Sequence, residues 1–137
     1  MTTTKQTKPT QAATRLAGIN IISADPLRLA DFYQRVLGAQ VVNDPAHGGP
    51  DRIEIWFGGP DDGHVFITVN RDPAFSPTQT QACQGFELRV SDANAEYARI
   101  TAMGVAVPEA PRDLPWGYRY FEVKDPDGNG VDLVQAL

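Results

Sequence analysis

Four carboxylates alternate with apolar residues in strand-like segments and could form a binding or acid–base site: Glu54, Glu87, Glu122 and Asp132. Successive side chains of a strand point to opposite faces of the sheet. When the apolar residues face the core, the residues between them therefore lie on the opposite, open face. Asp132 follows this rule, because Val131 and Leu133 flank it. Its carboxylate could accept a hydrogen bond from a ligand, act as a general base when desolvated, or pair with Arg52 or Arg89.

Aromatic side chains share this expected open face with the carboxylates. The same alternation places there Trp56, His64, Phe66, Thr68, Arg89, Tyr118 and Tyr120, and Trp116 lies in the adjoining PWG turn at 115–117. Trp56 and Trp116 could stack on a flat ligand, and ordinary packing is the alternative for each. Rings mixed with carboxylates favour a pocket for a neutral or cationic aromatic molecule, because ring stacking and cation–π contacts would hold it.

The composition limits the classes of partner. The 137 residues include 12 Lys and Arg against 17 Asp and Glu, a net charge of −5 that argues against nucleic acids and anionic membrane surfaces. The single cysteine, Cys83, allows no internal disulfide and is expected to be an inert thiol in a reducing cytoplasm. No segment reaches the length of a membrane span, and residues 1–14 lack a signal-peptide core and are expected to form a flexible tail.

The chain repeats one pattern twice. GINIISAD (18–25) leads into PLRLADFYQRVLG (26–38), and GFELRVSD (85–92) leads into ANAEYARITAMG (93–104). Asp25 and Asp92 are each a plausible helix N-cap, and Gly38 and Gly104 are natural helix stops. Such a period, close to half the chain, indicates a duplicated unit.

Each unit is expected to be a strand, a helix and three further strands. The expected later strands are 40–42, 52–57 and 65–70 in the first unit and 105–107, 118–124 and 131–134 in the second. This predicts an α+β fold of two tandem βαβββ modules, with one helix covering each sheet. Residues 15–137 would form a single domain, with module 1 at about 15–75 and module 2 at about 82–137.

The order of these motifs resembles the vicinal oxygen chelate superfamily, which includes glyoxalases, extradiol dioxygenases and bleomycin resistance proteins. The resemblance covers about residues 16–137 and depends on DFYQRVLGA (31–39), RVSDANAEYARITAMGV (89–105), LPWGYRYFEV (114–123) and DPDGNGVDLV (125–134). It implies a half-open barrel around a metal or ligand. Metal-dependent members use a His on the first strand and a carboxylate or amide on the last strand of each module, positions that here carry Gly18, Phe66, Gly85 and Asp132.

Three of those four positions have no ligating side chain, so we expect no metal and no cofactor. The alternative is a rewired site in which His64 joins Asp132, with Glu54, Glu87 or Glu122 adding oxygens. Two classes of function remain open at this point. One is a metal-independent protein that sequesters an aromatic or cationic small molecule in the cleft between its modules, as resistance members do. The other is an enzyme, similar to a lyase, isomerase or dioxygenase, whose catalytic residues the sequence leaves unassigned. The resemblance also implies a homodimer.

Overall fold

The computed structural model describes residues 16–58, 65–76 and 85–137. The expected tail at 1–14, most of the GGPDDG turn at 58–63, His64 and Cys83 lie outside these ranges.

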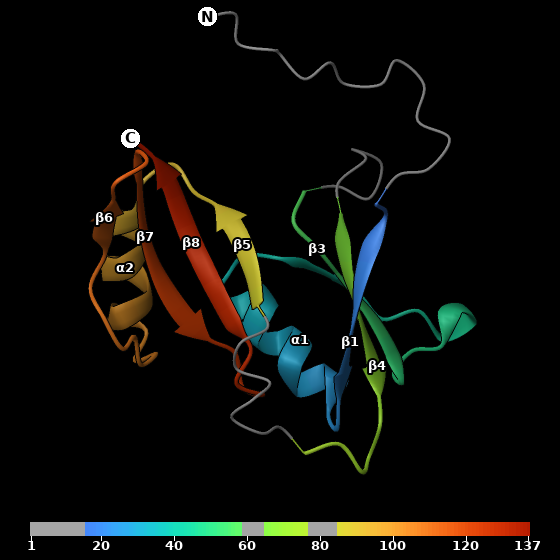
Figure 1. Ribbon diagram of the computed structural model, residues 1–137. Coiled ribbons are helices and arrows are strands. Elements are labelled where there is room, and N and C mark those ends of the chain that lie inside the picture. Colours follow the sequence, from blue (N-terminus) through green and yellow to red (C-terminus); the bar gives the residue numbers. More distant parts are fainter. Residues whose placement is uncertain (1–15, 59–64, 77–84) are drawn as a thin grey trace, which may run out of the picture.

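Two copies of one unit make up the described chain (Figure 1). The first contains β1 (Gly18–Ser23), α1 (Pro26–Arg35), β2 (Gln40–Val42), the 3-10 helix η1 (Pro45–His47), β3 (Arg52–Trp56) and β4 (Phe66–Arg71). The second contains β5 (Gly85–Arg89), α2 (Ala93–Ala102), β6 (Arg112–Leu114), β7 (Tyr118–Lys124) and β8 (Gly130–Ala136). The strand orders β1-β4-β3-β2 and β5-β8-β7-β6 match, with β1 parallel to β4 and β5 parallel to β8. The predicted α+β fold of two βαβββ modules is therefore confirmed.

Both helices begin at the predicted caps. The Asp25 carboxylate accepts from the backbone N–H of Arg28 at 3.2 Å, and the Asp92 carboxylate accepts from that of Ala95 at 3.0 Å. These bonds satisfy amide groups that have no partner inside the helix. Gly38 follows α1 with φ +73, a left-handed conformation that glycine adopts without steric cost.

The expected strand at 105–107 is wrong. Val105 and Val107 pack against the core as partly buried side chains, and the strand of this region is β6, at Arg112–Leu114. The reason lies in the turn that follows, because Leu114 pairs with Tyr118 across a tight connection and Gly117 has φ +93. Val105 and Val107, which have the spacing of a strand, thus pack against the core, while the less apolar segment Arg112–Leu114 forms the hydrogen-bonded pair with β7.

Each helix covers one face of its sheet, as the alternation predicts. Under α1 the buried residues include Ile53 and Ile55 of β3, both without exposed surface. Under α2 the Tyr97 ring meets the Phe121 ring edge-on at 5.7 Å. Val131 and Leu133 are buried in the same core, and Asp132 between them is half-buried on the opposite face.

The two modules meet through α1, which lies between the sheets in Figure 1. The Tyr33 hydroxyl of α1 donates to the Asp125 carboxylate, just after β7, at 2.8 Å. The Arg99 guanidinium of α2 donates to the Val36 carbonyl at 2.9 Å. Tyr33 is fully buried and Asp125 almost so, and the hydrogen bond between them therefore lies where an unpaired polar group would be costly.

None of the described helices is long and apolar enough to cross a membrane.

We expect Tyr33→Phe to lower the free energy of unfolding by about 1–3 kcal/mol, because the ring is kept and a buried carboxylate loses a donor. Urea denaturation followed by circular dichroism measures this. Tyr97→Phe is the matched control, since no hydrogen bond to the Tyr97 hydroxyl exists within the described residues. Equal stability of Tyr33→Phe and the wild type would show that the bond does not hold the modules together.

Candidate functional site

A cavity of about 530 Å³ lies on the open face of the second sheet. Its lining comes from β5, β6, β7, β8 and the turn between β6 and β7, and consists of Glu87, Arg89, Arg112, Leu114, Trp116, Tyr118, Tyr120, Asp132 and Val134. Six of these residues were expected from the sequence, namely Glu87, Arg89, Trp116, Tyr118, Tyr120 and Asp132. The alternation along β5, β7 and β8 therefore brings the predicted side chains of the second module together.

Three carboxylates form a row across the floor of this face. Asp132 on β8 is in register with Glu87 on β5 and with Glu122 on β7. Like charges directly opposite one another destabilise a sheet, so this row is unfavourable in the absence of a cation. Glu122 contacts the Lys124 ammonium at 3.0 Å, and the Arg89 guanidinium is 3.9 Å from Glu87. Asp132 has no hydrogen bond or ion pair with any other described side chain.

The surroundings of Asp132 resist its ionisation. Burial raises the pKa of this carboxyl above its ordinary value of 3.8, and the charges of Glu122 and Glu87 raise it further. Lys124 opposes the shift. A ligand ammonium beside Asp132 would reverse the effect, since an opposite charge nearby favours the ionised form. The cavity therefore contains a carboxylate suited to a cation or to proton transfer.

The tyrosine rings of the cavity each contact a guanidinium. Arg89 lies over the Tyr118 ring with its central carbon 4.9 Å from the ring centroid, and Arg112 lies over the Tyr120 ring at 5.3 Å. Arg112 also donates to the Tyr120 hydroxyl at 2.6 and 3.1 Å. Trp116 remains 69% exposed at the rim and offers a free ring. Two carboxylates and two guanidinium groups thus line this cavity, a more balanced charge than the expected acidic lining.

Three lining residues are not among the predicted site residues: Arg112, Leu114 and Val134. Arg112 and Leu114 are missing because the sequence predicts the strand at 105–107 instead. A signal existed in the chain: Arg112 and Tyr120 are placed symmetrically about the PWG turn, so a hairpin there puts them opposite each other.

The predicted site residues of the first module that the structure describes lie outside this cavity. Glu54 accepts from Arg52 at 2.8 Å and from the Trp56 indole at 3.0 Å, so both carboxylate oxygens are engaged within the first sheet. Trp56 is nearly buried and stacks on Phe66 with ring centroids 4.3 Å apart. None of these residues lines the cavity, and His64 lies outside the described part of the chain. Every residue that lines this cavity belongs to the second module, so this cavity is not the predicted cleft between the two modules, which stays a prediction.

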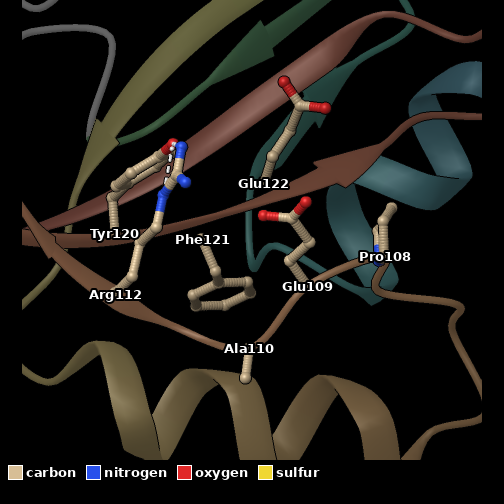
Figure 2. A pocket seen from close by; sticks show the side chains of 7 residues that line it. All are labelled: Pro108, Glu109, Ala110, Arg112, Tyr120, Phe121 and Glu122. Carbon is tan, nitrogen blue, oxygen red and sulfur yellow. Dashed lines mark hydrogen bonds between the residues drawn. The ribbon is translucent and has the colours of Figure 1, made fainter.

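A second cavity, of about 190 Å³, adjoins the first along β7 (Figure 2). Pro108, Glu109 and Ala110 of the loop before β6 form one wall, and Tyr120 and Glu122 of β7 line the side of the sheet. Arg112 and Tyr120 line both cavities. Figure 2 shows the bonded pair standing up from the two strands.

The four positions at which related proteins bind a metal do not fit one here. A Cβ atom on Gly85 would collide with the Gly130 carbonyl oxygen, and one on Gly18 would lie 2.9 Å from the Phe66 carbonyl oxygen. The register also places Glu87, rather than Gly85, beside Asp132. Within residues 16–58, 65–76 and 85–137, no group of three or more His, Cys, Asp or Glu could hold a metal ion.

Comparison with known proteins agrees with this architecture. The family model of the Glyoxalase/Bleomycin resistance protein/Dioxygenase superfamily matches residues 15–133. YwbC of Bacillus subtilis (strain 168) is 28% identical over 125 residues, covering 90% of this chain and 98% of its own. TnmS3, an antibiotic binding protein from Streptomyces sp. CB03234, superposes with a TM-score of 0.68 at 26% identity, covering 93% of this chain and 99% of its own. TioX from Micromonospora sp. ML1 superposes with a TM-score of 0.66 at 26% identity, covering 90% and 100%.

We expect Asp132→Asn to raise the free energy of unfolding at neutral pH by about 0.5 kcal/mol, because it removes one charge from a row of three. A raised folded-state pKa means that wild-type stability falls as pH rises through that pKa. The advantage of the variant should therefore be small at pH 4 and full at pH 7. Urea denaturation at both pH values measures it.

Asp113→Asn is the matched control. Asp113 pairs with Arg119 at 2.6 Å outside the cavity, and this bond holds the pKa of the Asp113 carboxyl below its usual range. Its replacement should bring no gain at neutral pH. An Asp132→Asn variant less stable than the wild type at pH 7 would contradict the account of the carboxylate row.

Proposed function

Because the chain belongs to the Glyoxalase/Bleomycin resistance protein/Dioxygenase superfamily, we propose that it binds a small aromatic or cationic molecule in the cavity of its second module. The observation that carries this proposal is Asp132, a carboxylate without an ionic partner among the described residues, set between two others and facing an aromatic-lined cavity. Sites of this kind, an apolar concavity with a few convergent polar groups, are typical of small-molecule binding.

The role that we propose is sequestration. TnmS3, which has the same fold and 26% identity to this chain, is an antibiotic binding protein. Fold alone does not determine function, so the similarity supports the proposal only together with the cavity. A flat ring could lie against Trp116 and Tyr118 while an attached amine reaches Asp132.

Binding without a metal is part of the proposal. It is supported by the lack of donor side chains at Gly18, Phe66 and Gly85 and by the steric closure at Gly85. A single Asp132 next to Glu87 supplies fewer ligands than a transition metal requires.

Acid–base catalysis is the second candidate, and the raised pKa of Asp132 favours it. A carboxyl with a pKa shifted towards neutrality is better placed to accept and return a proton. The two functions differ in the fate of the ligand, which a binding protein releases unchanged.

For the ligand, we expect aromatic amines to raise the melting temperature more than aromatic acids of the same ring, because an ammonium group can pair with Asp132, which has no ionic partner among the described residues. Asp132→Asn should weaken amine binding about tenfold, which corresponds to 1.4 kcal/mol. Thermal-shift screening followed by calorimetry measures both.

In that experiment Asp113→Asn controls for the change in net charge, and a chelator should leave binding unaffected. Mass spectrometry of the recovered amine separates binding from catalysis, since a binding protein returns it intact. Consistent stabilisation by the acids would contradict the proposed ligand class.

A homodimer is the assembly that we propose. β1 is an edge strand of its sheet, and Ile19 and Ile22 within it and Leu16 just before it are exposed apolar residues. Open edges with apolar side chains are commonly buried against a partner. Light scattering should give twice the mass of the 14.9 kDa chain at micromolar concentration, and a monomer mass would contradict this.

A further inference from the structure

The two cavities of the second sheet share one pair of lining side chains. Tyr118, Tyr120 and Glu122 follow one another on the open face of β7, with the larger cavity beside Tyr118 and the smaller one beside Glu122. Tyr120 lies between them, and Arg112 of β6 is directly opposite it in the ladder. These are the two residues that line both cavities.

The pair is held by contacts within itself. The guanidinium uses two of its nitrogens on the Tyr120 hydroxyl, at 2.6 and 3.1 Å, and lies over the ring. Arg112 forms no ion pair with a described carboxylate, and its side chain is exposed. A long exposed side chain bonded to a neutral hydroxyl can be displaced more readily than one held by a carboxylate.

We propose that the Arg112–Tyr120 pair determines the length of ligand that the site accepts. With the pair closed, a ligand is confined to the larger cavity. A ligand with a tail beyond its ring must displace the Arg112 side chain to place the tail in the smaller cavity, against Pro108 and Ala110. This inference rests on the proposed function, because it concerns the same site.

The test uses two acridines of equal charge that differ in length, 9-aminoacridine and 9-(pentylamino)acridine. The measured quantity is the ratio of their dissociation constants on one protein, which cancels any general effect of a variant on cation binding. Arg112→Ala should shift this ratio towards the pentyl compound by about tenfold, since burial of two methylenes is worth that much.

Two further variants test whether the hydrogen bond between Arg112 and Tyr120 matters, and not only the presence of an arginine. Tyr120→Phe keeps the ring and all charges but removes the hydroxyl that holds Arg112, so it should shift the ratio in the same direction by a smaller factor. Arg119→Ala is the matched control, because Arg119 occupies the next rung of the same hairpin and lines neither cavity. Its ratio should equal that of the wild type.

An unchanged ratio in Arg112→Ala, or an equal shift in Arg119→Ala, would overturn the inference. If neither acridine binds the wild type, the proposed ligand class fails, and the crystal structure of ligand-free Arg112→Ala then decides the inference separately. One continuous cavity along β7 supports it. Two cavities that remain separate without the arginine side chain overturn it.

Discussion

The hydrogen bond between Tyr33 and Asp125 is the contact on which the position of the site depends. Asp125 accepts from the backbone of Asp127 and Asn129 with one oxygen, and from the Tyr33 hydroxyl and the Asn129 amide with the other. These four bonds fix the turn from which β8 starts. The register of β8 against β7 then follows from that turn, and this register sets Asp132 opposite Glu122. A helix of the first module thus determines the chemistry of the second.

Stability and binding make opposite demands on the open face of the second sheet. The carboxylate row and the raised pKa of Asp132 cost stability in the unliganded protein, since charges repel and one of them is partly desolvated. Under the proposed function, a cationic ligand would relieve this repulsion, and the relief would contribute to the free energy of binding.

Much of the fold could be predicted because its signals are local. The repeated cap, helix and stop identify both helices within two residues of their ends, and period-2 alternation assigns β3, β7 and β8 to the correct faces. Pairing between strands is not local. The neighbour of Asp132 is Glu87 and not Gly85, and this depends on the register of a parallel pair that no turn connects. The strand at Arg112–Leu114 was missed for a related reason, because hydrophobic spacing at 105–107 reflects core packing.

The first sheet differs from the second at one position of the repeat. Trp56 and Phe66 occupy the rung of β3 and β4 that Glu122 and Asp132 occupy in β7 and β8. On that rung one copy has two rings in close contact, and the other has two carboxylates that repel. The same position of the repeat therefore contributes ring packing in one module and a carboxylate facing a cavity in the other. The proposed site would accordingly bind one molecule per chain, and not one per module.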